Sequence, residues 1–223
     1  MFCKYNGILY AVRRPYKRFY AWSPSISYLV GLIASDGCLQ KDGRHIDLTS
    51  KDIEQLKNFS LAVGRDFVIG KKLNGFGGIG YRIQLSDVAL YDFLLAAGLT
   101  PNKSKTIGAL NIPDIYYPDF LRGLFDGDGS TYGYMDPRWR SSFMFYVVFT
   151  SASADFLDYL RRTNSRLIGV SNGSIRHDAR ALTLGYAKQD SHKLSAYMYY
   201  EGHDLCLTRK KLKLAAFVFQ DKA

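Results

Sequence analysis

The most constraining feature of this sequence is an internal repetition. Three short patterns occur twice in the same order, the second copy lying roughly a hundred residues after the first. They are residues 29–37 with 121–129, the pair Thr49-Ser50 with Thr150-Ser151, and residues 99–105 with 207–213. Chance can produce one such match, but three in one order indicate a duplicated unit. We therefore predict two similar halves, residues 23–112 and 113–223, that pack as one pseudo-symmetric body behind an N-terminal arm of residues 1–22.

Each half has the pattern of a helix, two strands, a helix, two strands and a further helix, which is an α+β arrangement. Ser23 followed by Pro24 is a typical helix start, so the first helix is expected from Pro24 to about Ala34. Apolar and polar residues alternate around Ile46 and Leu48, which predicts a half-buried strand. By the same criteria we expect further helices over 51–63, 88–97, 118–125, 154–167, 188–200 and 210–219, and further strands over 68–73, 81–85, 142–149 and within 174–184.

The charge of the chain favours a polyanionic partner. Thirty Lys and Arg residues against twenty Asp and Glu residues give a formal charge of +10, which indicates nucleic acid before a membrane surface. The N-terminal arm is basic and free of acids, and it is interleaved with aromatic rings. These residues are Lys4, Arg13, Arg14, Lys17 and Arg18 with Tyr5, Tyr10, Tyr16, Phe19, Tyr20 and Trp22. The arm has two possible interpretations: it contacts a phosphate backbone, or its rings pack on the body of the protein.

Composition and spacing exclude several other classes. The apolar runs are shorter than the ~20 residues needed to cross a bilayer, and the N-terminus has no charged-then-apolar leader pattern, so we expect an intracellular chain that is not secreted. Its three cysteines are odd in number and contain no C-x-x-C pair, and its four histidines lack zinc-site spacing. We therefore expect reduced thiols and no structural zinc.

Each repeated apolar segment has two small residues four positions apart, Gly31 with Ser35 and Gly123 with Gly127. Residues at this spacing share one helix face, and their small size lets two helix backbones approach closely. If the two helices cross there, the next acids, Asp36 and Asp128, arrive side by side. Two adjacent carboxylates repel each other unless a proton or a divalent cation intervenes.

Hard oxygen ligands of this kind suit Mg²⁺, which also accepts phosphate oxygens. An acidic metal site in a basic body is suited to phosphodiester hydrolysis. The alternative interpretation is that each Asp-Gly pair only ends a helix and begins a turn, as such pairs often do. The occurrence of the pair at matching positions of both halves favours a functional site.

The segments LVGLIASDG (29–37) and LRGLFDGDG (121–129) resemble the paired signature of the LAGLIDADG homing endonucleases, in the single-chain form with two signatures. The resemblance covers about residues 23–219. It implies a duplicated αββαββα fold whose two four-stranded antiparallel sheets form a DNA-binding saddle. It also implies a monomer that cuts both DNA strands and leaves short 3′ overhangs.

By the same resemblance, Asp36 and Asp128 bind the catalytic divalent metal, with the carbonyls of Gly37 and Gly129 nearby. Basic residues beyond the last helix of each half are expected near the scissile phosphates. Lys103 and Lys211, which the repeat aligns, are the candidates, with Lys105 and Lys213 next; ordinary contact with backbone phosphates or a solubilising role on the helix is the alternative interpretation. The first signature departs from the family pattern at Ala34, where the second signature keeps an acid, Asp126.

The strands also predict the residues that read DNA bases. One sheet face packs on helices, so the alternate residues face the other way, where DNA lies in this architecture. Arg and Gln can each make paired hydrogen bonds to guanine and adenine, whereas aromatic and Met side chains suit thymine methyls. Strand parity selects Gln40, His45, Asp47, Thr49, Arg82 and Gln84 in the first half and Tyr132, Tyr134, Met144, Tyr146, Arg176 and Thr183 in the second.

The leading hypothesis is a Mg²⁺-dependent, site-specific endonuclease that acts on double-stranded DNA, encoded in a mobile intron or a free-standing element. The alternative is a non-cutting nucleic-acid-binding relative on the same scaffold, either an intron RNA maturase or a DNA-binding regulator. Retention of both Asp36 and Asp128 favours the endonuclease.

Overall fold

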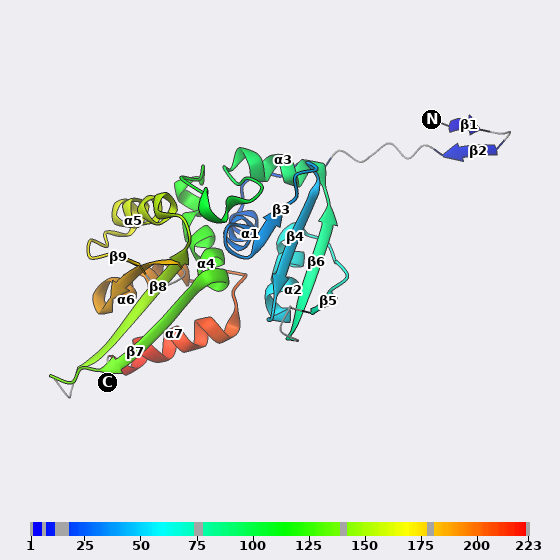
Figure 1. The fold of residues 1–223 in the computed structure, drawn as a ribbon. Helices are drawn as coiled ribbons and strands as arrows, with labels where there is room; N and C mark the ends of the chain where they lie inside the picture. Colours follow the sequence, from blue (N-terminus) through cyan, green and yellow to red (C-terminus); the bar gives the residue numbers. More distant parts are fainter. Residues whose placement is uncertain are drawn as a thin grey trace.

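Two helices, α1 (Pro24–Ser35) and α4 (Tyr117–Asp128), pack against each other in the middle of the computed structural model, and a sheet lies on each side of them (Figure 1). The structure describes residues 2–5, 8–11, 18–73, 78–138, 142–177 and 181–221. No helix in these ranges is long and apolar enough to cross a membrane.

The first half places α1 before one antiparallel sheet and two further helices. Its strands are β3 (Gly37–Leu39), β4 (His45–Ser50), β5 (Gly70–Leu73) and β6 (Ile79–Ser86), in the order β3-β4-β6-β5. Its other helices are α2 (Ile53–Val63) and α3 (Val88–Ala96), followed by the short 3₁₀ helices η1 (Lys103–Lys105) and η2 (Asp114–Tyr116). Ser23 and Asp87 cap the N-termini of α1 and α3 with their side chains.

The second half repeats this order and adds one helix. Its strands are β7 (Gly129–Met135), β8 (Phe143–Ser151), β9 (Ser174–His177) and β10 (Leu182–Ala187), in the order β7-β8-β10-β9. Its helices are α4, α5 (Ala154–Ile168), α6 (Lys188–Met198) and α7 (Thr208–Gln220). The two sheets therefore have one topology, and the predicted duplicated αββαββα order is confirmed.

One difference from the predicted elements is the end of α4, expected near Phe125 but found at Asp128. The pair Asp126-Gly127 predicts a turn, yet α4 continues through it because Gly127 packs directly on α1. A Cβ atom added to Gly127 would stand 1.9 Å from the Ser35 Oγ atom. Tertiary contact overrides the local turn preference here.

The close approach of α1 and α4 depends on glycine. A Cβ on Gly31 would stand 2.2 Å from the carbonyl oxygen of Phe120, and a Cβ on Gly123 would stand 2.1 Å from that of Tyr28. Real Cβ atoms do not approach backbone oxygens so closely, so each helix leaves room for the other only by lacking a side chain there. The predicted crossing at the small-residue pairs is confirmed.

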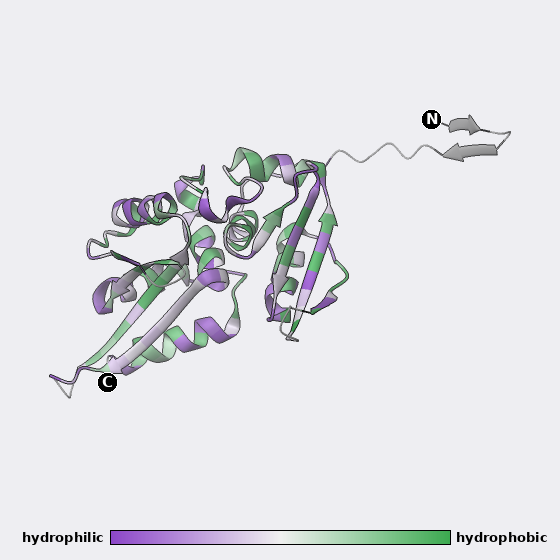
Figure 2. Cartoon of the chain, in the orientation of Figure 1, coloured by the Kyte–Doolittle hydropathy of each residue, from purple (hydrophilic) through white to green (hydrophobic). Residues whose placement is uncertain are grey.

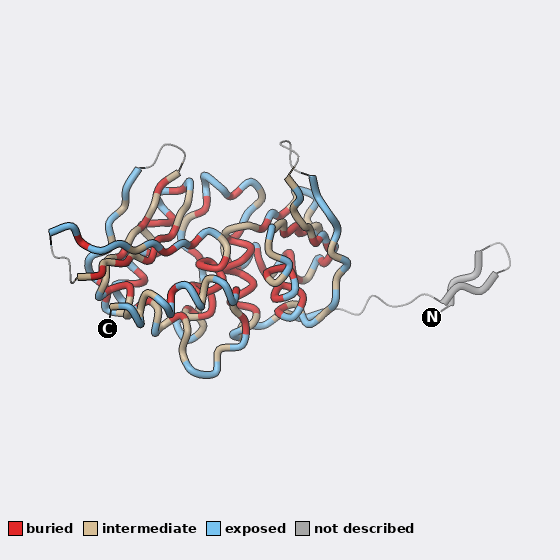
Figure 3. The backbone as a smooth tube through the Cα atoms, turned by 90° about the horizontal axis from the view of Figure 1, so that it is seen from below, coloured by how far each residue is buried: buried red, intermediate tan, exposed pale blue. Residues whose placement is uncertain are grey.

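The core gathers around this crossing. Buried residues concentrate along α1, α4 and the inner faces of the strands, and exposed residues lie outside (Figure 3). Polar and apolar residues alternate along β6 (Figure 2), where Ile83 and Leu85 are buried and Gln84 is exposed. Each sheet thus covers helices with one face and leaves its other face open.

The N-terminal arm lies partly outside the described residues, among them Arg13, Arg14, Tyr16 and Lys17. Strands β1 (Phe2–Tyr5) and β2 (Ile8–Ala11) pair with each other. From Arg18 onward the chain packs on the body: Arg18 and Tyr20 both hydrogen bond to Asp87, and Trp22 contacts Phe93 edge-on. For this end of the arm, packing on the body is the reading that the structure supports.

Candidate active site

Asp36 and Asp128 lie at corresponding ends of the two crossed helices. Asp36 is the C-cap of α1, and Asp128 is the last residue of α4. Asp36 lies against the partner helix, since its Oδ2 atom would stand 3.2 Å from a Cβ on Gly127. Burial raises the pKa of Asp36, and burial together with the negative charge of Asp36 raises the pKa of Asp128 to about 6. The two carboxylates therefore act on each other electrostatically.

One lysine from each half lies close to the two aspartates. The Nζ atom of Lys103, which is buried, donates to the carbonyl oxygen of Gly37 at 2.6 Å. The Nζ atom of Lys210 donates to the carbonyl oxygens of Phe125, Gly127 and Gly129 at 2.7, 2.7 and 2.6 Å. Gly37 and Gly129 each follow an aspartate directly, so the two lysines occupy equivalent positions.

Burial lowers the pKa of both ammonium groups, that of Lys210 to about 8, while the charges of Asp36 and Asp128 raise them. Each lysine therefore lies in the electrostatic field of both acids. The carbonyls of Gly37 and Gly129, which the resemblance placed near a metal, accept hydrogen bonds from these lysines.

The repeat aligned Lys103 with Lys211, but the structure places Lys210 at the equivalent position. The Nζ atom of Lys211 instead lies 3.1 Å from Nε2 of His203. The first half reaches its lysine through Asn102, whose backbone is left-handed (φ 58°), and through η1, whereas α7 begins directly at Thr208. The two connections differ by one residue, so a gapless sequence match pairs Lys103 with Lys211, although Lys210 is its structural equivalent.

The two acids differ in their hydrogen bonds. Nε2 of Gln55 in α2 donates to Oδ2 of Asp36 at 2.8 Å, and the Ser50 hydroxyl donates to Oε1 of Gln55 at 2.5 Å. Among the described residues, no side chain donates a hydrogen bond to Asp128. Gln55 is a site residue that the sequence did not indicate, because only the fold brings α2 to the end of α1.

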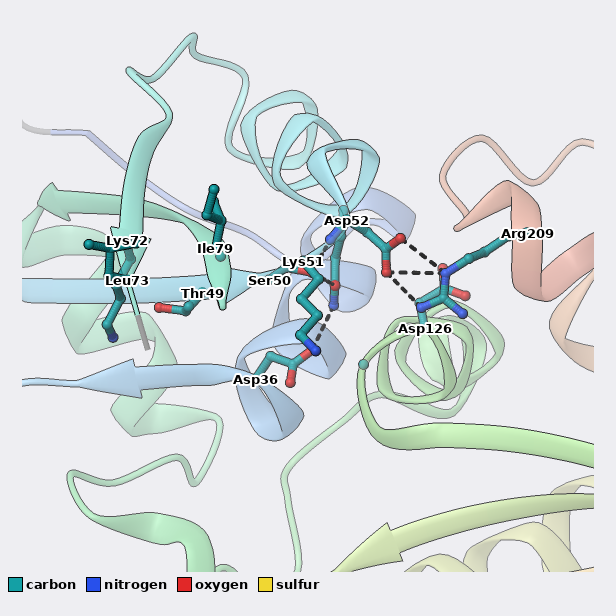
Figure 4. Close-up of a pocket in the computed structure, with 13 residues that line it drawn as sticks. Asp36, Thr49, Ser50, Lys51, Asp52, Lys72, Leu73, Ile79, Asp126 and Arg209 are labelled. Carbon is teal, nitrogen blue, oxygen red and sulfur yellow. Dashed lines mark hydrogen bonds and ion pairs between the residues drawn. The ribbon is translucent and has the colours of Figure 1, made fainter. Parts of the chain in front are cut away.

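A hollow adjoins each acid and is lined by the repeated Thr-Ser pair of one sheet. The hollow beside Asp36 has a volume of about 420 Å³ and includes Thr49 and Ser50, and that beside Asp128 has a volume of about 220 Å³ and includes Thr150 and Ser151. Each hollow is also lined by a basic residue from one half and an acid from the other. Arg209 of the second half lines the hollow beside Asp36, and Lys103 of the first half lines the hollow beside Asp128. Figure 4 shows the first hollow, where Asp52 forms an ion pair with Arg209 above Asp36 and Asp126.

The predicted base-reading residues of the first half share the outer face of their sheet. Asp47 is opposite Gln84 and Thr49 is opposite Arg82 across β4 and β6, whereas Ile46 and Leu48 face the core. Gln40 follows β3 and hydrogen bonds to Asp47, and the His45 ring pairs with Asp42 in the preceding turn. The strand parity predicted from the sequence is confirmed.

The second sheet presents an aromatic face at the corresponding place. Tyr132 is opposite Tyr146 and Tyr134 is opposite Met144, while Thr183 of β10 is opposite Arg176 of β9. The Tyr132 and Tyr146 rings stack with centroids 4.9 Å apart. A hollow of about 380 Å³ covers part of this face and includes Tyr132, Tyr146, Arg176 and Thr183. All six predicted residues of the second half therefore lie on one side of the sheet.

Solved structures share this architecture. The chain superposes on the homing endonuclease I-WcaI bound to its DNA recognition sequence with a TM-score of 0.63, at 15% identity over 86% of this chain and 88% of that one. I-DmoI in complex with DNA and Ca gives 0.53 at 15% identity, over 88% and 97%. The N-terminal LAGLIDADG domain of WhiA gives 0.53 at 15% identity, over 85% of each chain.

The chain has the LAGLIDADG fold. The expected pair of four-stranded antiparallel sheets and the structural resemblance to LAGLIDADG homing endonucleases are confirmed. No family model and no curated protein matches the sequence. At this level of identity the likeness extends to the fold alone.

Asp126 is the first acid of the segment 121–129 and serves the structure of the fold. Its Oδ2 atom accepts hydrogen bonds from the Tyr28 hydroxyl of α1 at 2.8 Å and from the backbone N–H of Leu207 at 2.6 Å. It thereby connects α4 with α1 and with the start of α7. Burial raises its pKa to about 6. Ala34 is the residue at the matching position of the first LAGLIDADG signature, and it is buried.

The donor set at the helix ends fits a divalent cation that keeps much of its water. Among the described residues no cluster of three or more His, Cys, Asp or Glu side chains forms a closed metal cage. Mg²⁺, however, is commonly held by one or two carboxylates with waters and substrate phosphates. Asp36 is half-buried and Asp128 is exposed, and desolvation raises the pKa of both carboxyl groups. A cation would offset their negative charge.

Proposed function

We propose that this chain is a site-specific endonuclease that cuts both strands of double-stranded DNA and leaves short 3′ overhangs. The observation that carries the proposal is the paired site at the crossing of α1 and α4. The charge of Asp36 raises the pKa of Asp128 there, and each half supplies one lysine, Lys103 or Lys210, bonded to the carbonyl after an aspartate. Partial desolvation and mutual repulsion of these two acids cost stability, and a scaffold used only for binding has no need of that cost.

Asp36 and Asp128 would hold the divalent metal, for which Mg²⁺ is the proposed ion. When bound, such a metal activates water and stabilises the leaving oxygen of a phosphodiester. Gln55 donates to Asp36 and so fixes the orientation of that carboxylate. The acids themselves supply the negative charge that makes a cation favourable at this point.

Lys103 and Lys210 would act by charge. Their carbonyl partners hold each ammonium group at the edge of the site, within the field of both acids. A fixed positive charge stabilises the additional negative charge that a phosphodiester gains in its transition state. Arg209 and Lys51, which line the hollow beside Asp36, would bind flanking phosphates.

The two open sheet faces would each read one half of the DNA site. We propose that residues 23–112 and 113–223 form the two functional units, with the polar face of the first and the aromatic face of the second in the major groove. The formal charge of +10 supports a DNA partner. One chain contains both units, which is consistent with action as a monomer.

A binding protein that does not cut is the second candidate. The LAGLIDADG domain of WhiA, which is not described as an endonuclease, superposes with the same TM-score as I-DmoI in complex with DNA and Ca, so the fold alone does not select the endonuclease. Tight, metal-independent binding of intron RNA or of DNA without nicking would support this candidate.

Selection from a randomised DNA library tests the proposal. The full chain is incubated with a plasmid library carrying randomised inserts, with Mg²⁺ or with EDTA, and linear products are sequenced. We expect a small set of related inserts to be cut only with Mg²⁺. Intact plasmids in every condition, together with enrichment of bound sequences in a parallel pull-down, would rule out the endonuclease and favour a protein that binds DNA without cutting it.

A further inference from the structure

The outer face of the first sheet contains an arginine whose orientation is fixed by a buried carboxylate. Arg82 of β6 donates from Nε at 2.8 Å and from Nη2 at 2.5 Å to Oδ1 of Asp47 on β4. The other oxygen, Oδ2, accepts from Nε2 of Gln40 at 2.6 Å. Both oxygens of Asp47 are therefore engaged within the sheet, and its side chain is only 9% exposed. Asp47 is poorly placed to contact a base itself.

The arginine keeps a defined set of donors free. A guanidinium group has five N–H donors, and Asp47 accepts the one on Nε and one of the two on Nη2. Nη1 has no hydrogen-bond partner among the residues that the structure describes. The remaining N–H groups of Nη1 and Nη2 lie along the end of the group. That end is the edge with which arginine can bind O6 and N7 of one guanine.

The neighbours of Arg82 leave this edge accessible. Its cross-strand partners are Thr49 on β4 and Gly70 on the edge strand β5. Gly70 has no side chain, and a Cβ added there would meet only the carbonyl oxygen of Arg82, at 3.8 Å. The Arg82 side chain is 35% exposed although its carboxylate partner is buried. A short side chain on one flank and none on the other leave room for a base.

We infer that Asp47 is a positioning residue that orients Arg82 to bind one guanine in the half of the DNA site that lies on the first sheet. The inference rests on the proposed DNA-binding function. It changes the role of Asp47 from the direct base contact that strand parity suggests to action through Arg82. A side chain ordered before binding loses less rotamer freedom when the base arrives. The carboxylate also offsets the arginine charge, which reduces attraction to phosphates of any sequence.

Selection of bound DNA tests this role. The full chain, with EDTA to prevent cutting, is used to enrich double-stranded DNA from a randomised library, and the bound fraction is sequenced. The variants are Arg82→Ala, Asp47→Ala and Asp47→Asn. The matched control is Asp136→Ala, because Asp136 is also a buried aspartate paired with an exposed arginine, Arg138, but belongs to the second half.

We expect the parent to prefer guanine at one position of one half-site and Arg82→Ala to lose that preference. Asp47→Ala should weaken the same preference by about tenfold and leave the other positions unchanged. Asp47→Asn, which keeps an oxygen acceptor, should give an intermediate value. Asp136→Ala should leave this position as in the parent. A purely structural role for Asp47 would weaken binding to all sequences without changing the preference at one position.

Thermal unfolding identifies variants that fail to fold. If Asp47→Ala does not fold, the selection is made with Asp47→Asn instead. An unchanged guanine preference in a folded Asp47 variant overturns the inference, as does an Arg82→Ala profile that matches the parent. If the parent enriches no sequence at all, the proposed function itself fails and the inference falls with it. The two failures are therefore distinguishable.

Discussion

The two halves have one fold but surround their acids with different groups. Asp36 accepts a hydrogen bond from Gln55, whereas Asp128 accepts none from the side chains that the structure describes. Lys103 donates to one carbonyl from a 3₁₀ turn, and Lys210 donates to three from a regular helix. The two halves are therefore alike where the helix backbones meet and differ in the side chains around the two aspartates.

The sheet faces have diverged further. The first presents a network of Gln40, Asp47 and Arg82, and the second presents a stack of Tyr132, Tyr146 and Tyr134. The buried faces of both sheets remain apolar because they share one core. A duplicated fold thus keeps the residues that pack and is free to vary the outward-facing residues. Two unlike faces suit a DNA site whose halves differ in sequence.

The largest effect on the cutting rate is expected from the aspartate that both halves have at the end of their first helix. Asp36→Asn and Asp128→Asn should each lower the rate of DNA cutting by about 1,000-fold, because each removes a charged ligand from the shared site. DNA binding should change little, since the basic surface remains. Plasmid cleavage and gel-shift titration measure the two quantities. If one variant cuts normally, the halves do not share the chemistry.

The next test compares adjacent lysines. Lys210→Ala should slow cutting by about 100-fold because it removes the half-buried cation beside both acids. It should also destabilise the fold, because three carbonyl oxygens lose a charged donor. Lys211→Ala should change the cutting rate by less than about threefold. If Lys211→Ala slowed cutting more than Lys210→Ala, Lys211 would be the functional partner of Lys103, as the sequence repeat predicts.

Patterns that depend on local periodicity were predictable from the sequence. The alternation of Ile46 and Leu48 with Asp47 and Thr49 identified both faces of β4, because side chains alternate strictly along a strand. The spacing of Gly31 with Ser35 predicted the helix crossing, because bulk at those positions would prevent close approach. Because the sequence is duplicated, each prediction made for the first half could also be made for the second.

Features that depend on loop conformation or on distant elements were not predictable. Lys210 was missed because Asn102 adopts a left-handed backbone in only one of the two connections. Gln55 looks like an ordinary polar residue of an amphipathic helix until α2 is placed beside Asp36. Asp126 and Tyr28 belong to different helices, and their hydrogen bond exists only because those helices cross.

The glycine crossing is expected to be equally sensitive in both halves. Gly31→Ala and Gly123→Ala should each lower the free energy of unfolding by about 3 kcal/mol, since the new methyl group would overlap a backbone oxygen of the partner helix. Gly108→Ala is the control, because a Cβ there meets no atom within 4 Å. Urea denaturation measures all three. A large difference between Gly31→Ala and Gly123→Ala would show that one helix can shift and the other cannot.

The smallest effect should reveal the asymmetry of the acids. Gln55→Ala removes the side-chain donor that the described residues provide to Asp36, and it leaves Asp128 unaffected. Cutting of one strand should slow by about tenfold, the cost of one hydrogen bond to a charged group. Nicked plasmid should therefore accumulate before the linear form, which a time course on agarose resolves. Gln84→Ala, on the exposed outer face of β6, is the control and should change affinity rather than the ratio of nicked to linear product. Equal slowing of both strands by Gln55→Ala would mean that the two acids work as one unit, so that their different hydrogen bonds have no kinetic consequence.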